Sequence, residues 1–229
     1  MPTISDEEFG TITVRRSARA TQVRIRVAPD GSLRASMPVY APLVLLKRLI
    51  KTSRPQLRRM REQAQPHQSY ADGQTIGKSH TLVVRTGQPL AVVRRHQQIV
   101  VTLPADKTLS DSDVVMAIRS ASNAALRKEA KAYLPRRLER LAAQHGFFYN
   151  KVIFTHASSR WGSCSSTQTI SLNIALMKLP FELIDYVLIH ELAHTIEMNH
   201  SPAFWAVVEQ ADPQYAQHRR LLKNETPSI

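Results

Sequence analysis

The sequence contains a single cysteine and few aromatic residues. Its 229 residues include one Cys, and Phe, Trp and Tyr together make up 6%. The lone thiol, Cys164, excludes an internal disulfide and a cysteine-rich zinc cluster. Tyr40 and Tyr70 are the main aromatic residues of the first 80, so this part offers little surface on which single-stranded nucleic acid bases can stack.

Long apolar runs are also missing. No stretch reaches the ~18 apolar residues that a membrane span requires. The first ten residues, MPTISDEEFG, are acidic, whereas a secretory signal peptide is basic and apolar. We therefore expect a soluble, cytoplasmic protein with no membrane partner. With 43% hydrophobic residues, the chain can bury one good core or two small ones.

Positive charge is concentrated in the first two thirds of the chain. Lys and Arg outnumber Asp and Glu by 13 to 5 in residues 1–70 and by 12 to 6 in residues 71–150, whereas residues 151–229 hold 6 and 7. This basic N-terminal half can contact nucleic acid phosphates, which makes nucleic acid a candidate partner. A solvated basic face, or a field that steers acidic substrates, is the interpretation we favour.

The first 70 residues predict strands and one helix. Residues 1–10 have the pattern of a loose tail. Alternating apolar and polar residues predict a hairpin over residues 23–37, with its turn at 29–32 and a basic outer face. A helix rich in Lys and Arg is expected over residues 41–64, with an interruption near Pro55.

The remaining residues predict a second helical region with short strands. A long helix is expected over residues 111–144, broken at Pro135 and ended by Gly146. Strands over residues 152–155 and 169–173 enclose a polar loop, and an apolar helix follows.

The order of these elements indicates an α+β fold. Three further strands are expected between residues 80 and 103. We therefore predict two domains: a basic, strand-rich region with helices over residues 1–105, and a zincin-like catalytic helical core with a small sheet over residues 106–229.

A zinc-binding motif lies inside the last of these helices. His190, Glu191 and His194 form the pattern H-E-x-x-H. Residues four apart lie on one face of a helix, so both imidazoles can reach one cation. Zn²⁺ makes a bound water more acidic, and the neighbouring Glu191 carboxylate can take the released proton as general base. The motif therefore predicts one Zn²⁺ per chain and a hydrolytic reaction.

A hydrolytic zinc site needs a third protein ligand, and His200 is the candidate. It follows His194 by six residues, so the helix must end and the chain must turn back. Asn199 tolerates the left-handed conformation common at helix ends. Ser201 is a good N-cap with Pro202 at the first position of a second helix. Sites of this kind also accept other divalent ions.

Two carboxylates are alternatives to His200. Glu209 lies in the following helix, and Glu197 lies one turn past His194, where it can also orient a ligand. Tyr186, one turn before His190, can donate a hydrogen bond to an intermediate, although a tyrosine buried at a cleft rim is the commoner case.

The loop before the helix carries further candidates for substrate binding. Arg160 can hold a carboxylate or phosphate or stabilise an oxyanion, or it can pair with Asp185 or Glu197. Trp161 is expected to fill the core beneath the site.

Two smaller polar residues complete this set. Ser163 belongs to the same small and polar loop, and Asn173 either hydrogen-bonds near the site or ends a strand. If the strand over residues 169–173 is an edge strand, it can bind an extended peptide by strand addition.

Several of these motifs occur in an order that resembles one protein family. They are Ser159–Cys164 (SRWGSC), Ile170–Asn173 (ISLN), Asp185–His194 and Asn199–Trp205 (NHSPAFW). The chain resembles the YgjP-like metallopeptidases, whose core is related to the WLM and SprT-like proteases. The resemblance is close over residues 120–224 and looser before them.

The resemblance implies zinc bound by His190, His194 and His200, with Glu191 as general base. A zinc metallopeptidase acting on peptides or proteins is therefore the predicted function. The alternatives are a zinc hydrolase of phosphodiesters or other non-peptide bonds, and a nucleic-acid-binding protein with a structural metal. Neither the physiological substrate nor the oligomeric state follows from the sequence.

Overall fold

The chain folds into two compact units with separate cores. The computed structural model describes residues 2–27, 32–64 and 70–227. The units are residues 1–69 and 70–229. The boundary expected after residue 105 lies inside the second unit, because the strands before it pack on the long helix that follows it. The architecture is mixed α+β, which confirms the predicted fold class.

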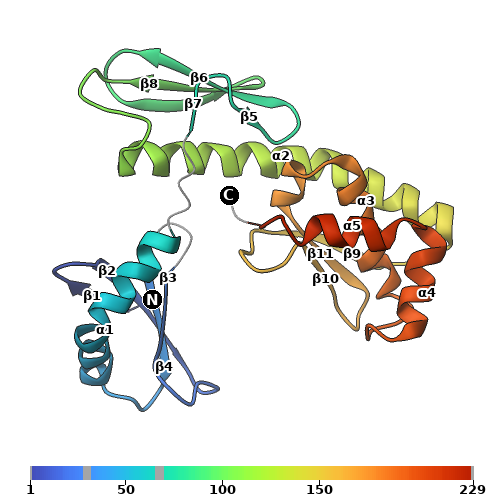
Figure 1. The fold of residues 1–229 in the computed structure, drawn as a ribbon, viewed down its shortest axis with the longest axis horizontal. Helices are drawn as coiled ribbons and strands as arrows, with labels where there is room; N and C mark the ends of the chain where they lie inside the picture. Colours follow the sequence, from blue (N-terminus) through green and yellow to red (C-terminus); the bar gives the residue numbers. More distant parts are fainter. Residues whose placement is uncertain (1, 28–31, 65–69, 228–229) are drawn as a thin grey trace. The chain divides into compact units, whose positions relative to one another are not determined.

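The first unit is a four-stranded sheet with one helix. Its strands are β1 (Thr3–Asp6), β2 (Gly10–Ser17), β3 (Arg24–Val27) and β4 (Leu33–Pro38), in the order β1-β2-β4-β3. The helix α1 (Leu43–Ala64) lies alongside this sheet (Figure 1). The core of the unit is made by apolar side chains from strands and helix: Phe9, Ile12, Val14, Leu33, Ala35, Met37, Ala41, Leu46, Ile50 and Leu57.

Two expectations for this unit need revision. The loose tail predicted for the first ten residues is wrong, because β1 pairs with β2 in antiparallel register. The Asp6 carboxylate holds the turn between them by accepting hydrogen bonds from the backbone N–H groups of Glu8 and Phe9. The hairpin of β3 and β4 forms as predicted, with Arg24 and Arg26 exposed. Its expected turn at 29–32 lies largely outside the described residues.

Neither proline breaks its helix. α1 continues through Pro55, and the long helix α2 (Ser112–His145) continues through Pro135. Buried leucines lie within three residues of each proline, at Leu57 and Leu134. Their packing offsets the one hydrogen bond that each proline removes.

The second unit is organised around α2. β5 (Thr75–Ile76), β6 (His80–Thr86), β7 (Ala91–Arg95) and β8 (Gln98–Leu103) form a sheet in the order β5-β6-β8-β7. This sheet lies over the N-terminal half of α2, and the remaining elements surround its C-terminal half (Figure 1). As predicted, Gly146 ends the helix in the left-handed conformation, with φ of 71°.

A small sheet precedes the catalytic helix. β9 (Lys151–Thr155) pairs with β11 (Thr169–Asn173) in parallel, and β10 (Gly162–Cys164) pairs with β11 in antiparallel register. β11 is therefore the central strand, so the condition for strand addition at residues 169–173, an edge position, is not met. The sequence pattern missed β10, which is only three residues long and lies in the small, polar loop.

Four short helical segments complete the unit. They are η1 (Ile174–Lys178), α3 (Phe181–Ala193), α4 (Pro202–Ala211) and α5 (Tyr215–Leu222). α3 is almost wholly apolar around its circumference, and most of it is buried against α2, η1 and the small sheet. Among the described residues, no helix combines the length and apolar character needed to cross a bilayer.

Candidate metal centre

Three histidines converge at the end of α3. His190 lies in the last turn of α3, and His194 is its C-cap residue. His200 lies just before α4, and one ring nitrogen from each histidine falls within 4.8 Å of the other two. Tetrahedral Zn²⁺ with Zn–N bonds of about 2.0–2.1 Å holds its nitrogens roughly 3.3 Å apart. The three imidazoles therefore fit one ion after small side-chain adjustments.

The turn between α3 and α4 brings His200 close to the two histidines at the end of α3. The Ser201 side chain caps α4 by accepting a hydrogen bond from the Phe204 N–H, and Pro202 occupies the first turn. The left-handed conformation expected at Asn199 is not found, since the described non-glycine residues with positive φ are His96 and Gln168. The helix instead ends through tight turns after His194, in which the N–H groups of residues 195–197 donate to carbonyls of α3.

The imidazoles are arranged as neutral ligands. Nε2 of His190 and Nε2 of His200 are 3.1 Å apart. Nδ1 of His194 lies 3.0 Å from the Glu197 carbonyl, which leaves its Nε2 for the cluster. Burial, followed by the charges of His194 and His200, lowers the pKa of His190 to about 3. A neutral imidazole is the form that binds a metal.

Phe204 is a site residue that the sequence pattern did not single out. Its fully buried ring packs against all three imidazoles, with ring centroids 5.0 Å from His190, 4.5 Å from His194 and 4.8 Å from His200. Trp205 stacks on His200 at 5.7 Å. The sequence offers one signal for this role, which is spacing. Phe204 lies four residues after His200, in the first turn of the helix that Ser201 caps. These two rings restrict where the imidazoles can turn.

Glu191 is a buried carboxyl beside the cluster. Its side chain points toward β10, its exposed fraction is 5%, and Oε2 has no hydrogen-bond partner among the described residues. Burial raises its pKa to about 8, and the positive charge of Arg160 opposes this shift. A buried, unpartnered carboxyl is costly to a fold, so its presence here points to a chemical role.

The close approach of β10 to α3 depends on Gly162. A Cβ added at this residue would lie 2.6 Å from Oε1 of Glu191 and 2.7 Å from its Cγ. The side chain of Glu191 therefore occupies the space that any other residue at this position would fill.

Asn173 holds the polar loop in place. Its fully buried amide donates hydrogen bonds to the carbonyls of Ala157 (2.6 Å) and Arg160 (2.9 Å) and accepts one from the Ala175 N–H (3.0 Å). This side chain ties the start of η1 to the loop that carries Arg160 and Trp161. Asn173 therefore supports the loop through its hydrogen bonds.

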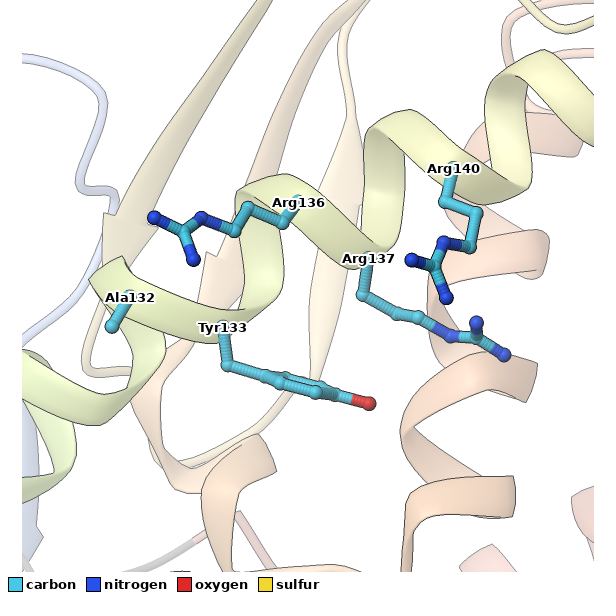
Figure 2. A pocket seen from close by; sticks show the side chains of 5 residues that line it. All are labelled: Ala132, Tyr133, Arg136, Arg137 and Arg140. Atoms are coloured by element: carbon cyan, nitrogen blue, oxygen red, sulfur yellow. The ribbon is translucent and has the colours of Figure 1, made fainter.

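Arg160 is exposed on that loop, near Glu191. It does not pair with Asp185, because Asp185 binds Arg137 of α2 through two hydrogen bonds of 2.7 and 2.6 Å. Arg137 lines a cavity of about 420 Å³ on α2, separate from the histidines, together with Ala132, Tyr133, Arg136 and Arg140 (Figure 2). Asp185 thus anchors α3 to α2.

A second cavity, of about 210 Å³, opens beside the metal cluster. Tyr186 is almost fully buried in its wall, its ring centroid is 6.0 Å from that of His190, and burial raises its pKa to about 12. The half-buried Ser163 does not line this cavity. The lining residues come from β10 and the loop before it, from α3 and from α5: Trp161, Gly162, Tyr186, Val187, His190, Glu191 and Leu222.

The carboxylates considered as alternative ligands stay outside the cluster. Within the described ranges, only the three histidines form a group of metal-ligand residues. Glu197 contributes its backbone carbonyl to His194. Glu209 lies in the last turns of α4 and is exposed.

Comparison with known proteins agrees with a candidate metal centre in this chain. The family model described as "YgjP-like, metallopeptidase domain" matches residues 21–225. The chain belongs to this family. As a YgjP-like protein it is a metallopeptidase, which confirms the resemblance and the enzyme class predicted from the H-E-x-x-H helix.

Solved structures and curated proteins add little to this assignment. The YgjP-like chain is 29% identical to the chain in the crystal structure of the metallopeptidase zymogen of Pyrococcus abyssi abylysin. That match covers 39% of this chain and 92% of the other, with a TM-score of 0.36. No curated protein matches the chain.

Proposed function

We propose that this YgjP-like protein is a zinc-dependent peptidase in which His190, His194 and His200 hold the ion and Glu191 is the general base. The observation that carries the proposal is the convergence of three imidazole nitrogens within 4.8 Å beside a buried carboxyl. Three neutral imidazoles are the ligand set of hydrolytic zinc sites, which keep one position open. A structural zinc would need a fourth ligand, and none joins the cluster in the part of the chain that the structure describes.

The bound ion supplies Lewis-acid activation of the water and of the scissile carbonyl. The chain's own residues then move the protons. Glu191 accepts a proton from the attacking water and delivers it to the leaving amine. Its buried environment, which favours the protonated form, makes the first of these transfers easier. Trp161, Tyr186 and Leu222 line the cavity beside Glu191 and give it a largely apolar wall.

A peptide is the substrate class that this arrangement supports. β10 is an edge strand, so its outer backbone groups can pair with an extended peptide. Arg160 lies beside Glu191 on the exposed loop, where it can bind a carboxylate or the oxyanion formed during hydrolysis.

The first test is metal content, measured by mass spectrometry on purified protein. We expect about one zinc per chain in the wild type, and its loss in His200→Ala, because two ligands on one helix bind a metal much more weakly than three. His156→Ala is the matched control, since His156 is an exposed histidine outside the cluster. Zinc that is retained in His200→Ala, or lost equally in both variants, contradicts the proposed ligand set.

A further inference from the structure

One face of the first unit's sheet is built from arginine and hydroxyl side chains. The register places Thr13, Arg34 and Arg26 side by side in one row, and Arg15, Ser36 and Arg24 in the next. Residues paired in this way point to the same face of a sheet. Their neighbours along each strand, including Val14 and Ala35, point to the opposite face and are buried in the core.

This arginine face, defined by Arg15, Arg24, Arg26 and Arg34, carries a single sign of charge. Among the described strand residues, the other positions on this side are Thr3, Ser5, Thr11, Thr13, Ser17, Ser36 and the buried Pro38. None of them is acidic.

Two carboxylates of the first unit, Asp6 and Glu8, are engaged by the helix. Asp6 binds Arg54, and Glu8 binds Arg54 and Arg58, all through residues of α1. In the described part of the chain, no ion pair involves Arg15, Arg24 or Arg26.

The arrangement brings arginines of neighbouring strands side by side. Arg26 lies directly opposite Arg34 across the antiparallel pair, and Arg24 and Arg15 flank Ser36 in the next row. An anionic partner that lies across both rows would contact arginines from several strands at once. The repeated spacing calls for a partner with regularly repeated negative charges, because a single small anion can neutralise only one or two guanidinium groups.

We infer that the arginine face binds the phosphate backbone of duplex nucleic acid without reading its sequence. Guanidinium groups match phosphate geometry in two-pronged hydrogen bonds, and Ser and Thr hydroxyls add phosphate contacts. The outward positions hold no aromatic side chain on which bases could stack, which favours a duplex over a single strand. Duplex DNA also presents the denser phosphate charge.

The same positions argue against a membrane surface as the partner. Peripheral membrane binding combines cationic residues with large apolar side chains that enter the lipid. The outward positions of the four strands contain no such side chain. The exposed apolar residues of this unit lie instead in the connection from β4 to α1 and in the first turn of α1: Val39, Tyr40, Leu43, Val44 and Leu45.

Fluorescence anisotropy with a labelled DNA duplex of random sequence tests the inference on the full chain. If Arg15, Arg24 and Arg26 each contact one phosphate, the logarithm of affinity falls with the logarithm of salt at a slope of about −2.7. This slope corresponds to a loss of about 40-fold between 50 and 200 mM salt. The double variant Arg24→Gln/Arg26→Gln should bind at least about tenfold more weakly at 50 mM salt, with a slope reduced by about two.

A matched control removes the same charge from the other side of the sheet. Lys47→Gln/Lys51→Gln changes two exposed residues of α1 and should leave affinity within roughly twofold, because salt screens distant charges. Circular dichroism spectra and unfolding midpoints identify any variant that does not fold. Peptidase turnover should be unchanged in both variants.

Three results would overturn the inference. The first is equal weakening by the two double variants, which would mean that only net charge matters. The second is affinity that does not change with salt. The third is equal or tighter binding of polyglutamate, or of vesicles containing phosphatidylserine, with the same dependence on Arg24 and Arg26.

Discussion

The first unit and the C-terminal part of the second unit differ in how they carry charge. In residues 151–229, which hold the three histidines, acidic and basic residues nearly balance, and Glu191 is buried. In residues 1–70, basic residues outnumber acidic ones by 13 to 5, and four arginines lie on one exposed sheet face. Burial shifts the pKa values of His190 and Glu191, whereas exposure keeps the arginines of the first unit in contact with solvent. The same residue classes therefore suit different roles in the two regions.

The largest expected effect of a substitution is on turnover by the second unit. Glu191→Gln removes the general base and should lower peptidase turnover by roughly 10²–10⁴-fold. Zinc content and duplex binding should stay at wild-type levels, because Glu191 is neither a proposed ligand nor part of the first unit. Activity assays combined with metal analysis and anisotropy measure all three properties. Wild-type turnover in this variant would exclude Glu191 as the base.

Removal of Phe204 tests whether the two cores are independent. Phe204→Ala deletes a fully buried ring that packs on three imidazoles and should destabilise the second unit by about 3–5 kcal/mol. Calorimetry should show that transition move while the transition of the first unit stays fixed, because the buried residues of the two units form separate clusters. Val44→Ala, at an exposed position, is the control. If both transitions shift together, the units are coupled.

A smaller effect is expected where β10 approaches the catalytic helix. Gly162→Ala places a methyl group 2.6 Å from Oε1 of Glu191. The carboxyl must move, and displacement by about 1 Å can lower turnover on the order of 100-fold. Zinc content should be retained. Ser163→Ala, the next residue on β10, should remain near wild type, and an equal loss in both would point to a general defect of the strand.

The smallest predicted effect concerns a buried carboxylate far from the metal. Glu129 of α2 accepts hydrogen bonds from the Lys78 N–H, the Ser79 N–H and the Ser79 hydroxyl, and its Oε1 lies 2.6 Å from His80 Nδ1. Burial raises its pKa, but these hydrogen bonds outweigh burial and hold the pKa below its usual value of 4.5. The stability contributed by Glu129 is therefore present above about pH 4.5 and is lost as pH falls through the lowered pKa.

Denaturant unfolding at several pH values checks this prediction. Glu129→Gln should destabilise the second unit by roughly 1.5–3 kcal/mol at pH 7, and its difference from the wild type should shrink in acid. Glu139→Gln, an exposed change on the same helix, provides the comparison. A difference that is constant with pH would contradict the assignment.

Local signals predicted the metal centre better than the sheets around it. The H-E-x-x-H spacing, the Ser201 cap and Pro202 act within one or two turns of chain, so they are readable from sequence. The parallel pairing of β2 with β4 and of β6 with β8 joins strands that are not neighbours in sequence, and no local pattern encodes it. The edge position of β10 was missed for the same reason.

The site's supporting residues show the same limit. Asn173 and Gly162 act through contacts with residues distant in sequence, namely the loop carbonyls and Glu191. Their residue types alone are equally consistent with a strand end and a flexible loop. The first-unit arginines were visible as a basic hairpin, but their gathering into rows with Arg15 required the strand order.

The placement of the tryptophans gives the protein an internal optical probe. The chain has two Trp residues. Trp161 lines the cavity beside Glu191, and Trp205 stacks between His200 and Tyr215, with the Arg219 guanidinium over its ring. All intrinsic tryptophan emission therefore originates at the metal centre. Loading and chelation of the ion can be followed without a label, whereas events confined to the first unit should leave this signal unchanged.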